Sequence, residues 1–421
     1  MTDGNVYSTF PLVRLWGDRT DSVCKTKGVF MERYDITQKV TFKKGTYKLN
    51  SDANFNFQLN RVIMWDGGDA DEVAGVSQGI KTSSDWVSAM ERLAEKAHAE
   101  SRTENEIAYL RMSEFFIYDT DPKKQQRYLE AAELFYEYYG DYFDKGIVAR
   151  HEVPYSGGYL PVMVTKAQGE SRGAILLHGG NDSYFEELFF PMLYLAENGF
   201  DVYLFEGPGQ GGVLRVQGMK FTHKWEKPTK AVLDYFGLDD VTIVGASLGG
   251  YLAPRAAAFE KRIKRVAAWS IFPDFFDVLI CDHPKPMRDA IDFMFRMGLT
   301  APLNKLYTSM MEKEEIVKWN LMHGMYAYDA KTPCEYVQKI RRFTLKNIAD
   351  RIDRDMLILG AKQDHLIMPY LFHEEYDLLQ NARSLTLRLL TDKQDAGAHC
   401  NVGNSKLALD SIIKWIECCI E

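Results

Sequence analysis

The sequence feature that most constrains this chain is the segment Gly245-Ala246-Ser247-Leu248-Gly249, which follows the apolar run Val241–Val244. The β-branched run is typical of a buried strand, and residues 248–260 have the composition of a helix. A serine placed between a strand and a helix needs a turn so tight that only glycine-sized neighbours avoid a clash. This G-x-S-x-G pattern therefore predicts a nucleophile raised above the edge of a sheet, with a helix N-terminus aimed at the group it attacks. A strand-to-helix turn without chemistry is the alternative that the short pattern leaves open.

The composition narrows the class of protein. The 421 residues suffice for one large domain with an appendage or for two domains, and 46% apolar and 26% charged residues are typical of a soluble globular chain. A net charge of −8 argues against a nucleic-acid or anionic-membrane partner. The N-terminus has no basic region followed by an apolar core, and no apolar run approaches the roughly 18 residues of a membrane helix. The cysteines are scattered without C-x-x-C spacing, so we expect a cytoplasmic protein with reduced thiols, no metal and no cofactor.

Strand-like and helical segments alternate along the second half of the chain. The predicted strands are a hairpin of 147–153 and 160–165, followed by 173–178, 201–205, 241–244, 265–271, 356–360 and 385–390. The predicted helices between and after them are 184–198, 222–236 and 402–420. This alternation indicates a mostly parallel central sheet flanked by helices on both faces. Functional residues are then expected at the C-terminal ends of the strands.

Two segments depart from this alternation. Residues 1–145 begin irregularly, with a short strand predicted near Lys39–Phe42, and continue as an α-helical unit of three or four helices. Helices are predicted to start with a cap at Ser84, at Thr103 and at Asp121-Pro122. Residues 273–350 contain proline-broken helical runs and no strand-like run. We therefore predict an N-terminal helical segment over 1–145, a core over 146–272 and 351–421, and a helical lid insertion over 273–350.

The partners that a nucleophilic serine requires lie at the ends of two later strands. A histidine must take the serine proton, and a carboxylate must fix the tautomer of that histidine. Asp364 lies on the loop after the strand 356–360, and His399 lies on the loop between the strand 385–390 and the last helix. The order serine, acid, histidine is the order expected for a nucleophile on such a turn. The sequence thus predicts Ser247, Asp364 and His399 as a catalytic triad.

Other titratable residues near these loops are weaker candidates. Asp274, just after the strand 265–271, is the best alternative acid. The remaining candidates are His365, His373, Asp392, Asp395 and Cys400. Adjacent residues of an exit loop seldom face each other, which disfavours His365 beside Asp364 and Cys400 beside His399. His373 falls in a helical stretch, and the two aspartates lie too near the histidine loop.

The charge that develops on the substrate needs hydrogen-bond donors. The backbone N–H of Leu248 directly follows the serine, and a second donor is expected from the loop His178–Asp182. We predict the N–H of Gly180, with that of Asn181 as the alternative, and a structural role for His178. A second glycine-rich segment, Glu206–Gly212, lacks the Lys-Ser/Thr of a phosphate loop and the spacing of a dinucleotide site, so it predicts a tight turn.

Together these motifs resemble those of the α/β-hydrolase fold. The resemblance rests on HGGNDSYFEELFF, FEGPGQGG, GASLGGYLAPRAAAFEKR, GAKQDH and GAHCN, placed after a helical segment, and covers roughly residues 60 to 421. Within this fold the chain is similar to a group containing dihydroxypseudooxynicotine hydrolase, the fermentation-respiration-switch esterases and hydrolases that shorten aromatic polyketides. Some members of the group break a carbon–carbon bond next to a carbonyl. No substrate contact can be carried over, because the lid follows no fixed motif.

The resemblance implies a serine hydrolase without a cofactor, acting on a small acyl or polyketide substrate that is free or bound to a carrier protein. Cleavage of a carbon–carbon bond in a 1,3-dicarbonyl compound is the leading hypothesis. A carboxylesterase, a thioesterase or an aminopeptidase-like hydrolase is the alternative, and a non-catalytic binding module is the alternative of another class. The N-terminal helical segment can serve as a lid, as the surface of a homodimer, or as both.

The predicted lid is rich in aromatic and methionine side chains, which could line an apolar substrate cavity or pack within the lid itself. They are Phe293, Met294, Phe295, Met297, Met310, Met311, Trp319, Met322, Met325 and Tyr326.

Overall fold

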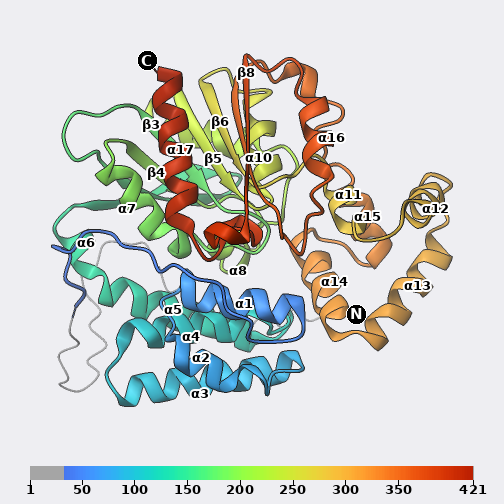
Figure 1. Ribbon diagram of the computed structural model, residues 1–421, viewed down its shortest axis with the longest axis horizontal. Helices are drawn as coiled ribbons and strands as arrows, with labels where there is room; N and C mark the ends of the chain where they lie inside the picture. The colour runs from blue at the N-terminus through green and yellow to red at the C-terminus, as the bar shows by residue number, and fades with distance from the viewer. Residues whose placement is uncertain (1–32, 421) are drawn as a thin grey trace, which may run out of the picture.

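The computed structural model describes residues 33–420 and has an eight-stranded sheet at its centre, in the order β1-β2-β4-β3-β5-β6-β7-β8 (Figure 1). The strands are β1 Val148–Tyr155, β2 Gly158–Thr165, β3 Ala174–His178, β4 Asp201–Phe205, β5 Val241–Ala246, β6 Ile263–Trp269, β7 Asp355–Ala361 and β8 Ser384–Leu390. The β1–β2 hairpin and the β2–β4 pair are antiparallel, and all other pairs are parallel. The predicted fold class is confirmed.

Helices cover both faces of the sheet. They are η1 Phe185–Leu188, α7 Phe189–Glu197, α8 Gly211–Arg215, α9 Glu226–Phe236, α10 Gly249–Ala257, α16 Leu371–Leu378 and α17 Ser405–Ile420. Side chains of α7 and α17 share one hydrophobic core with the sheet, and side chains of α9, α10 and α16 share the core on the opposite face. Burial from both sides explains why every residue of β5 and of β7 is buried, and why these strands are continuous apolar runs in the sequence.

The N-terminal helical segment has more helices than the sequence predicted. They are α1 Ala53–Met64, α2 Ala70–Ser77, α3 Ser83–Ala99, α4 Thr103–Phe115, α5 Pro122–Tyr138 and α6 Gly140–Asp144. Helices α1 to α5 lie together below the sheet in Figure 1. The cap of α3 is Thr82, whose side chain forms a capping box with Asp85, so the predicted cap at Ser84 is wrong by two positions. Asp121 caps α5, and Pro122 stands in its first turn as predicted.

The strand predicted near Lys39–Phe42 is also wrong. This segment is extended but belongs to no ladder, because it runs past helix α7 rather than beside a strand. The N–H of Val40 donates to the side chain of Glu197 at the end of α7, at 3.1 Å. An extended stretch whose N–H is taken by a side chain does not extend the sheet.

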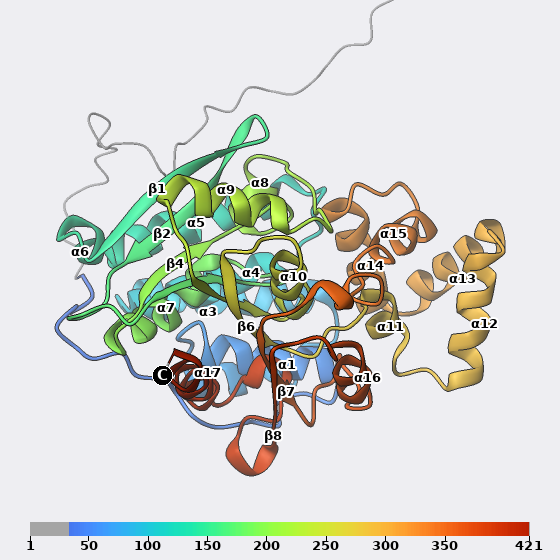
Figure 2. The ribbon, with the colours of Figure 1, turned by 90° about the horizontal axis from the view of Figure 1, so that it is seen from above.

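Five α-helices and the short 3-10 helix η2 Ala349–Arg351 lie between β6 and β7, and the five α-helices form the lid insertion. They are α11 Phe275–Ile280, α12 Lys285–Arg296, α13 Thr300–Lys313, α14 Glu315–Ala327 and α15 Pro333–Ile340. Figure 2 shows α12 and α13 projecting away from the sheet, while α11 and α15 lie closer to it. Over residues 33–420, no helix combines the length and the apolar character needed to cross a membrane.

Candidate active site

The turn between β5 and α10 places Ser247 in a strained backbone conformation. The φ angle of Ser247 is 59°, in the left-handed region that residues with a side chain seldom adopt. A Cβ atom at Gly245 would lie 2.4 Å from the carbonyl oxygen of Gly249, so a side chain at this position is excluded. The N–H of Ser247 donates to the carbonyl of Trp269 at the end of β6, at 3.2 Å. The turn is therefore tight, and the neighbouring strand holds its serine in place.

The structure brings Ser247, His399 and Asp364 together. The hydroxyl oxygen of Ser247 lies 2.8 Å from Nε2 of His399, and Nδ1 of the same ring lies 2.7 Å from Oδ2 of Asp364. The other carboxylate oxygen of Asp364 accepts the backbone N–H groups of Leu366 and Ile367, at 2.9 and 3.1 Å. Three loops that follow different strands thus meet in one continuous line of hydrogen bonds.

Burial and nearby charges shift the pKa values of His399 and Asp364. Burial lowers the pKa of His399, but the charge of Asp364 and its hydrogen bond raise that pKa more, so it lies well above its ordinary value. Burial likewise raises the pKa of Asp364, and the nearby imidazole more than offsets this, so the pKa is lowered. An ionised Asp364 accepts the proton on Nδ1 and stabilises the charged ring, and once Nε2 has lost its proton it can accept the proton of Ser247.

The rival candidates occupy other places. Asp274 caps helix α11 by accepting the N–H of Asp277 at 3.0 Å. His365 packs on Phe57, with the ring centroids 4.8 Å apart, and burial lowers the pKa of His365 to about 4. His373 is exposed on α16.

Three further side chains near the histidine loop also point to other partners. The thiol of Cys400 lies 3.7 Å from the carbonyl of Trp269. The backbone N–H of Asp392 donates to the side-chain oxygen of Gln363 at 3.2 Å. The carboxylate of Asp395 forms an ion pair with Lys44 at 3.6 Å.

The loop after β3 approaches the serine closely. A Cβ atom at Gly180 would lie 2.6 Å from Cβ of Ser247 and 2.7 Å from the backbone nitrogen of Leu248, so only glycine fits. The N–H of Gly180, the donor predicted from the sequence, is occupied by the hydroxyl of Ser183 at 2.9 Å. Within residues 33–420 the N–H groups of Leu248 and of the alternative, Asn181, have no acceptor. Leu248 directly follows Ser247, and Asn181 directly follows the glycine that contacts it, so both N–H groups are candidate oxyanion donors.

Residues of the N-terminal helical segment and of the lid insertion, which together cover the site, also contact it. The sequence analysis missed these contacts. The ring of Phe57, on α1, lies 5.9 Å from the ring of His399. The hydroxyl of Tyr328, at the end of α14, donates to the side chain of Asn181 at 2.8 Å. Neither residue belongs to a motif, and each lies far along the chain from the residue it touches. The sequence carries no signal that could have found them.

The aromatic and methionine side chains of the lid do not act as one set. Phe293 of α12 and Met297 directly after this helix are 59% and 61% exposed, so neither side chain is packed within the lid. Trp319 stacks on Phe115 of the N-terminal helical segment, with the ring centroids 5.0 Å apart. Met311 and Met325 line a cavity of about 500 Å³ among α13, α14 and the start of α15.

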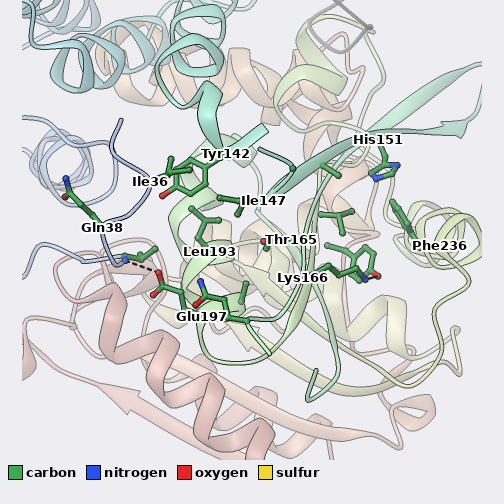
Figure 3. Close-up of a pocket in the computed structure, with 17 residues that line it drawn as sticks. Ile36, Gln38, Tyr142, Ile147, His151, Thr165, Lys166, Leu193, Glu197 and Phe236 are labelled. Atoms are coloured by element: carbon green, nitrogen blue, oxygen red, sulfur yellow. Dashed lines mark hydrogen bonds between the residues drawn. The ribbon is translucent and has the colours of Figure 1, made fainter. Parts of the chain in front are cut away.

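A second cavity, of about 440 Å³, lies away from the triad (Figure 3). It opens between the turn at Ile36, the β1–β2 hairpin and helix α7, and Tyr142, His151, Lys166 and Glu197 are among its lining residues. Lys166 is already paired with Asp201 at 2.9 Å. No triad residue lines this cavity, so it is separate from the candidate active site.

Comparisons with known proteins agree with this architecture. The model of the alpha/beta hydrolase family matches residues 174–400. The chain is 28% identical over 334 residues to hydrolase LUC6 of a Fusarium species, covering 73% of this chain and 78% of that protein. It is 28% identical over 362 residues to 20-hydroxy-prefusarin hydrolase FUS2 of Gibberella moniliformis, covering 75% and 84%. The solved structure of 2,6-dihydroxy-pseudo-oxynicotine hydrolase shares the fold, with a TM-score of 0.59, 20% identity and coverage of 85% and 94%.

Proposed function

Because the chain belongs to the alpha/beta hydrolase family, we propose that it is a serine hydrolase whose nucleophile is Ser247. His399 acts as general base and then general acid, and Asp364 orients the imidazole and stabilises its charged form. The observation that carries this proposal is the line of hydrogen bonds from Ser247 through His399 to Asp364, at 2.8 and 2.7 Å. A fold that only bound ligands would have no need of this arrangement.

In this proposal the N–H groups of Leu248 and Asn181 form the oxyanion hole. Both are free of other acceptors in the described part of the chain, and the close approach of Gly180 brings their loops together. Donors fixed before the reaction stabilise the negative charge that appears on the substrate oxygen without having to reorganise. The N–H of Asn181 thus takes the role that the sequence suggested for Gly180.

We further propose that the bond cleaved is a carbon–carbon bond of a 1,3-dicarbonyl compound. Ser247 Oγ attacks one carbonyl carbon while His399 takes the hydroxyl proton. Collapse of the tetrahedral intermediate breaks the bond to the central carbon, whose electron pair is delocalised as an enolate over the second carbonyl. His399 returns the proton to that carbon, and water then hydrolyses the acyl-enzyme with His399 as base. The products are a carboxylic acid and a ketone.

The relatives support a natural-product substrate but leave the bond open. One of them is a 20-hydroxy-prefusarin hydrolase, and 28% identity carries the class of reaction further than the identity of the substrate. The triad and the two N–H donors would serve an ester or thioester equally well, because both pass through the same tetrahedral intermediate. A carboxylesterase or thioesterase is therefore the second candidate.

Covalent labelling tests the nucleophile. A fluorophosphonate probe should label the folded protein on Ser247, and Ser247→Ala should abolish labelling. Ser84→Ala, which removes an exposed serine of the N-terminal helical segment, should label like the wild type. A folded wild-type protein that resists the probe would overturn the enzyme proposal. Turnover of an aryl β-diketone is then compared with that of the matching aryl ester, and hydrolysis of the ester alone would favour the second candidate.

A further inference from the structure

The glycine-rich segment Glu206–Gly212, after β4, takes no part in the mechanism above, yet it lies against the loop that carries the oxyanion donor. We propose that Gln210 is a positioning residue, which holds the N–H of Asn181 in the direction that the developing oxyanion requires. This inference rests on the proposed function and assigns a role within the same site.

Both the nitrogen and the oxygen of the Gln210 side-chain amide form hydrogen bonds with backbone groups. Its Nε2 donates to the carbonyl oxygens of Gly179 and Gly180, at 2.8 and 2.9 Å. Its Oε1 accepts the N–H of Gly207 at 2.9 Å, and the side chain is 1% exposed. A buried amide with all these hydrogen bonds formed has one favourable orientation, because any rotation would leave polar groups unpaired.

The carbonyl of Gly180 and the N–H of Asn181 belong to the same peptide group. In a planar trans peptide the C=O and N–H bonds point in opposite directions. Gln210 pulls the carbonyl into the protein interior, so the N–H on the other side of the plane must point away from Gln210. The preceding peptide is held as well, since Gln210 binds the carbonyl of Gly179 while Ser183 accepts the N–H of Gly180. Both peptides of the turn are therefore fixed.

Glu206, from the same segment, holds the far end of this loop. One carboxyl oxygen accepts the N–H of Phe185 at 3.0 Å, and the other accepts the N–H of Gly212 at 2.8 Å. A Cβ atom at Gly211 would lie 1.7 Å from the Glu206 carboxyl, which explains a glycine there. The segment is thus a clamp on residues 179–185, with Gln210 next to the donor and Glu206 farther from it.

The structure offers a matched control in Asn60 of α1. Its Nδ2 donates to the carbonyls of Tyr47 and Asn56, at 2.9 and 2.8 Å, and its Oδ1 accepts the N–H of Tyr47 at 2.8 Å. Asn60 is 4% exposed. It therefore has the same hydrogen-bond inventory and similar burial as Gln210, but its partners lie in the N-terminal helical segment and not on the oxyanion loop.

The test compares Gln210→Met with Asn60→Leu, each a near-isosteric loss of the amide. The measured quantities are the maximal rate at which the fluorophosphonate labels Ser247 and the probe concentration that gives half of it. A misplaced oxyanion donor costs up to about 100-fold in rate. Gln210→Met should lower the maximal rate about 10- to 100-fold and shift the half-maximal concentration less than about two-fold, with an unchanged pH dependence because His399 is untouched. Asn60→Leu should label within about two-fold of the wild type.

The outcomes separate the two proposals. Labelling of Gln210→Met at the rate of Asn60→Leu, with normal labelling of the wild type, overturns the role of Gln210 and leaves the serine hydrolase standing. Absence of labelling in the wild type removes both. If Gln210→Met does not fold, Glu206→Gln replaces it, because this change removes one acceptor and keeps the shape of the side chain. A maximal rate lowered about three- to ten-fold would support the clamp, and an unchanged rate would overturn it.

Discussion

The N-terminal helical segment and the lid insertion both cover the site, but they are attached by different interactions. Arg61 of α1 and Arg111 of α4 meet Glu187 of η1 in a buried network, in which Arg61 is also hydrogen-bonded to Glu187 through its Nε at 2.8 Å. The side chain of Glu187 is fully buried, and those of the two arginines are 6% and 7% exposed. Over residues 33–420, no buried ion pair joins the lid to the strands or helices of the core, and the ion pairs of the lid lie within it or reach the N-terminal segment. The lid packs on the core through rings such as Tyr328, which stacks on Phe221 with the ring centroids 4.8 Å apart.

The way in which the N-terminal helical segment and the lid insertion are attached indicates which of the two can move. Separating the N-terminal helices from the core would leave Arg61 or Glu187 as an unpaired charge in a dry interface, which costs several kcal/mol. Within the lid, the pair of Arg341 and Asp292 is wetter, with the side chains 28% and 25% exposed and the charged atoms 2.7 Å apart. Water replaces such a pair at little cost. We therefore expect substrate to enter on the lid side while the N-terminal helices stay in place.

The largest expected effect comes from the buried network. Arg61→Met should lower the free energy of unfolding by about 4 kcal/mol, because Glu187 loses one of its two arginines in the interior. Arg341→Met, the matched change in the lid, should cost no more than about 1 kcal/mol. Urea unfolding of the two variants measures both values. Equal losses would break the comparison between the covers.

A second effect concerns the place where the two covers meet. Trp319 of α14 is 5% exposed and packs against Phe115 and Phe116, with both ring pairs 5.0 Å apart. Trp319→Ala should cost about 3 kcal/mol, since it empties a volume that the surrounding rings cannot refill. The exposed neighbour Lys318 serves as reference, and Lys318→Ala should change the unfolding free energy by less than about 0.5 kcal/mol. A loss of under 1 kcal/mol for Trp319→Ala would show that the covers are independent.

The same junction contains an ion pair whose strength depends on pH. Asp119, after α4, lies 2.9 Å from Nδ1 of His323 on α14, with Lys124 and Arg215 nearby. Burial raises the pKa of Asp119, but the charges of His323 and Lys124 lower it by more than burial raises it. The pKa of Asp119 therefore lies below its ordinary value. A lowered carboxyl pKa stabilises the fold above about pH 4, and this stabilisation is lost as the pH falls through the folded-state value.

Asp119→Asn should therefore cost about 2 kcal/mol at pH 7 and less at pH 3. The measurement is the difference in unfolding free energy between wild type and variant at the two pH values. A difference that grew on acidification would contradict the sign of the pKa shift. Asp329, which is exposed, provides a reference carboxylate, and Asp329→Asn should show almost no difference at either pH.

The core of the fold and the site could be predicted because local patterns coincide there with strand order. Ser247 lies on a turn that admits little but glycine around it, and parallel strands carry Asp364 and His399 to the same edge of the sheet. Central strands such as β5 and β7 also appear in the sequence as apolar runs, since they are buried on both faces. Sequence order was then enough to predict that these three side chains meet.

The covers could not be predicted in the same way, because their contacts join distant parts of the chain. Nothing near Arg61 in the sequence indicates that it binds Glu187, 126 positions away. The proposed change of oxyanion donor from Gly180 to Asn181 rests on contacts of the same kind. Gly180 fits the glycine pattern, but its N–H donates to Ser183, and Gln210 of another loop binds the carbonyls of Gly179 and Gly180. Tertiary hydrogen bonds of this kind leave no periodic signal.

The smallest expected effect is on the outward face of the lid. Phe293 of α12 and Met297 directly after this helix are more than half exposed, whereas Phe295 between them is 8% exposed and packs on Phe276. Replacing both exposed residues, as Phe293→Ser with Met297→Ser, should change the unfolding free energy by less than about 0.5 kcal/mol, because both side chains stay mostly in water on folding. Phe295→Ala should cost about 3 kcal/mol by the same measurement. A large loss from the double serine variant would mean that this face is covered in solution, and the contrast between a fixed N-terminal cover and a looser lid would then fail on the lid side.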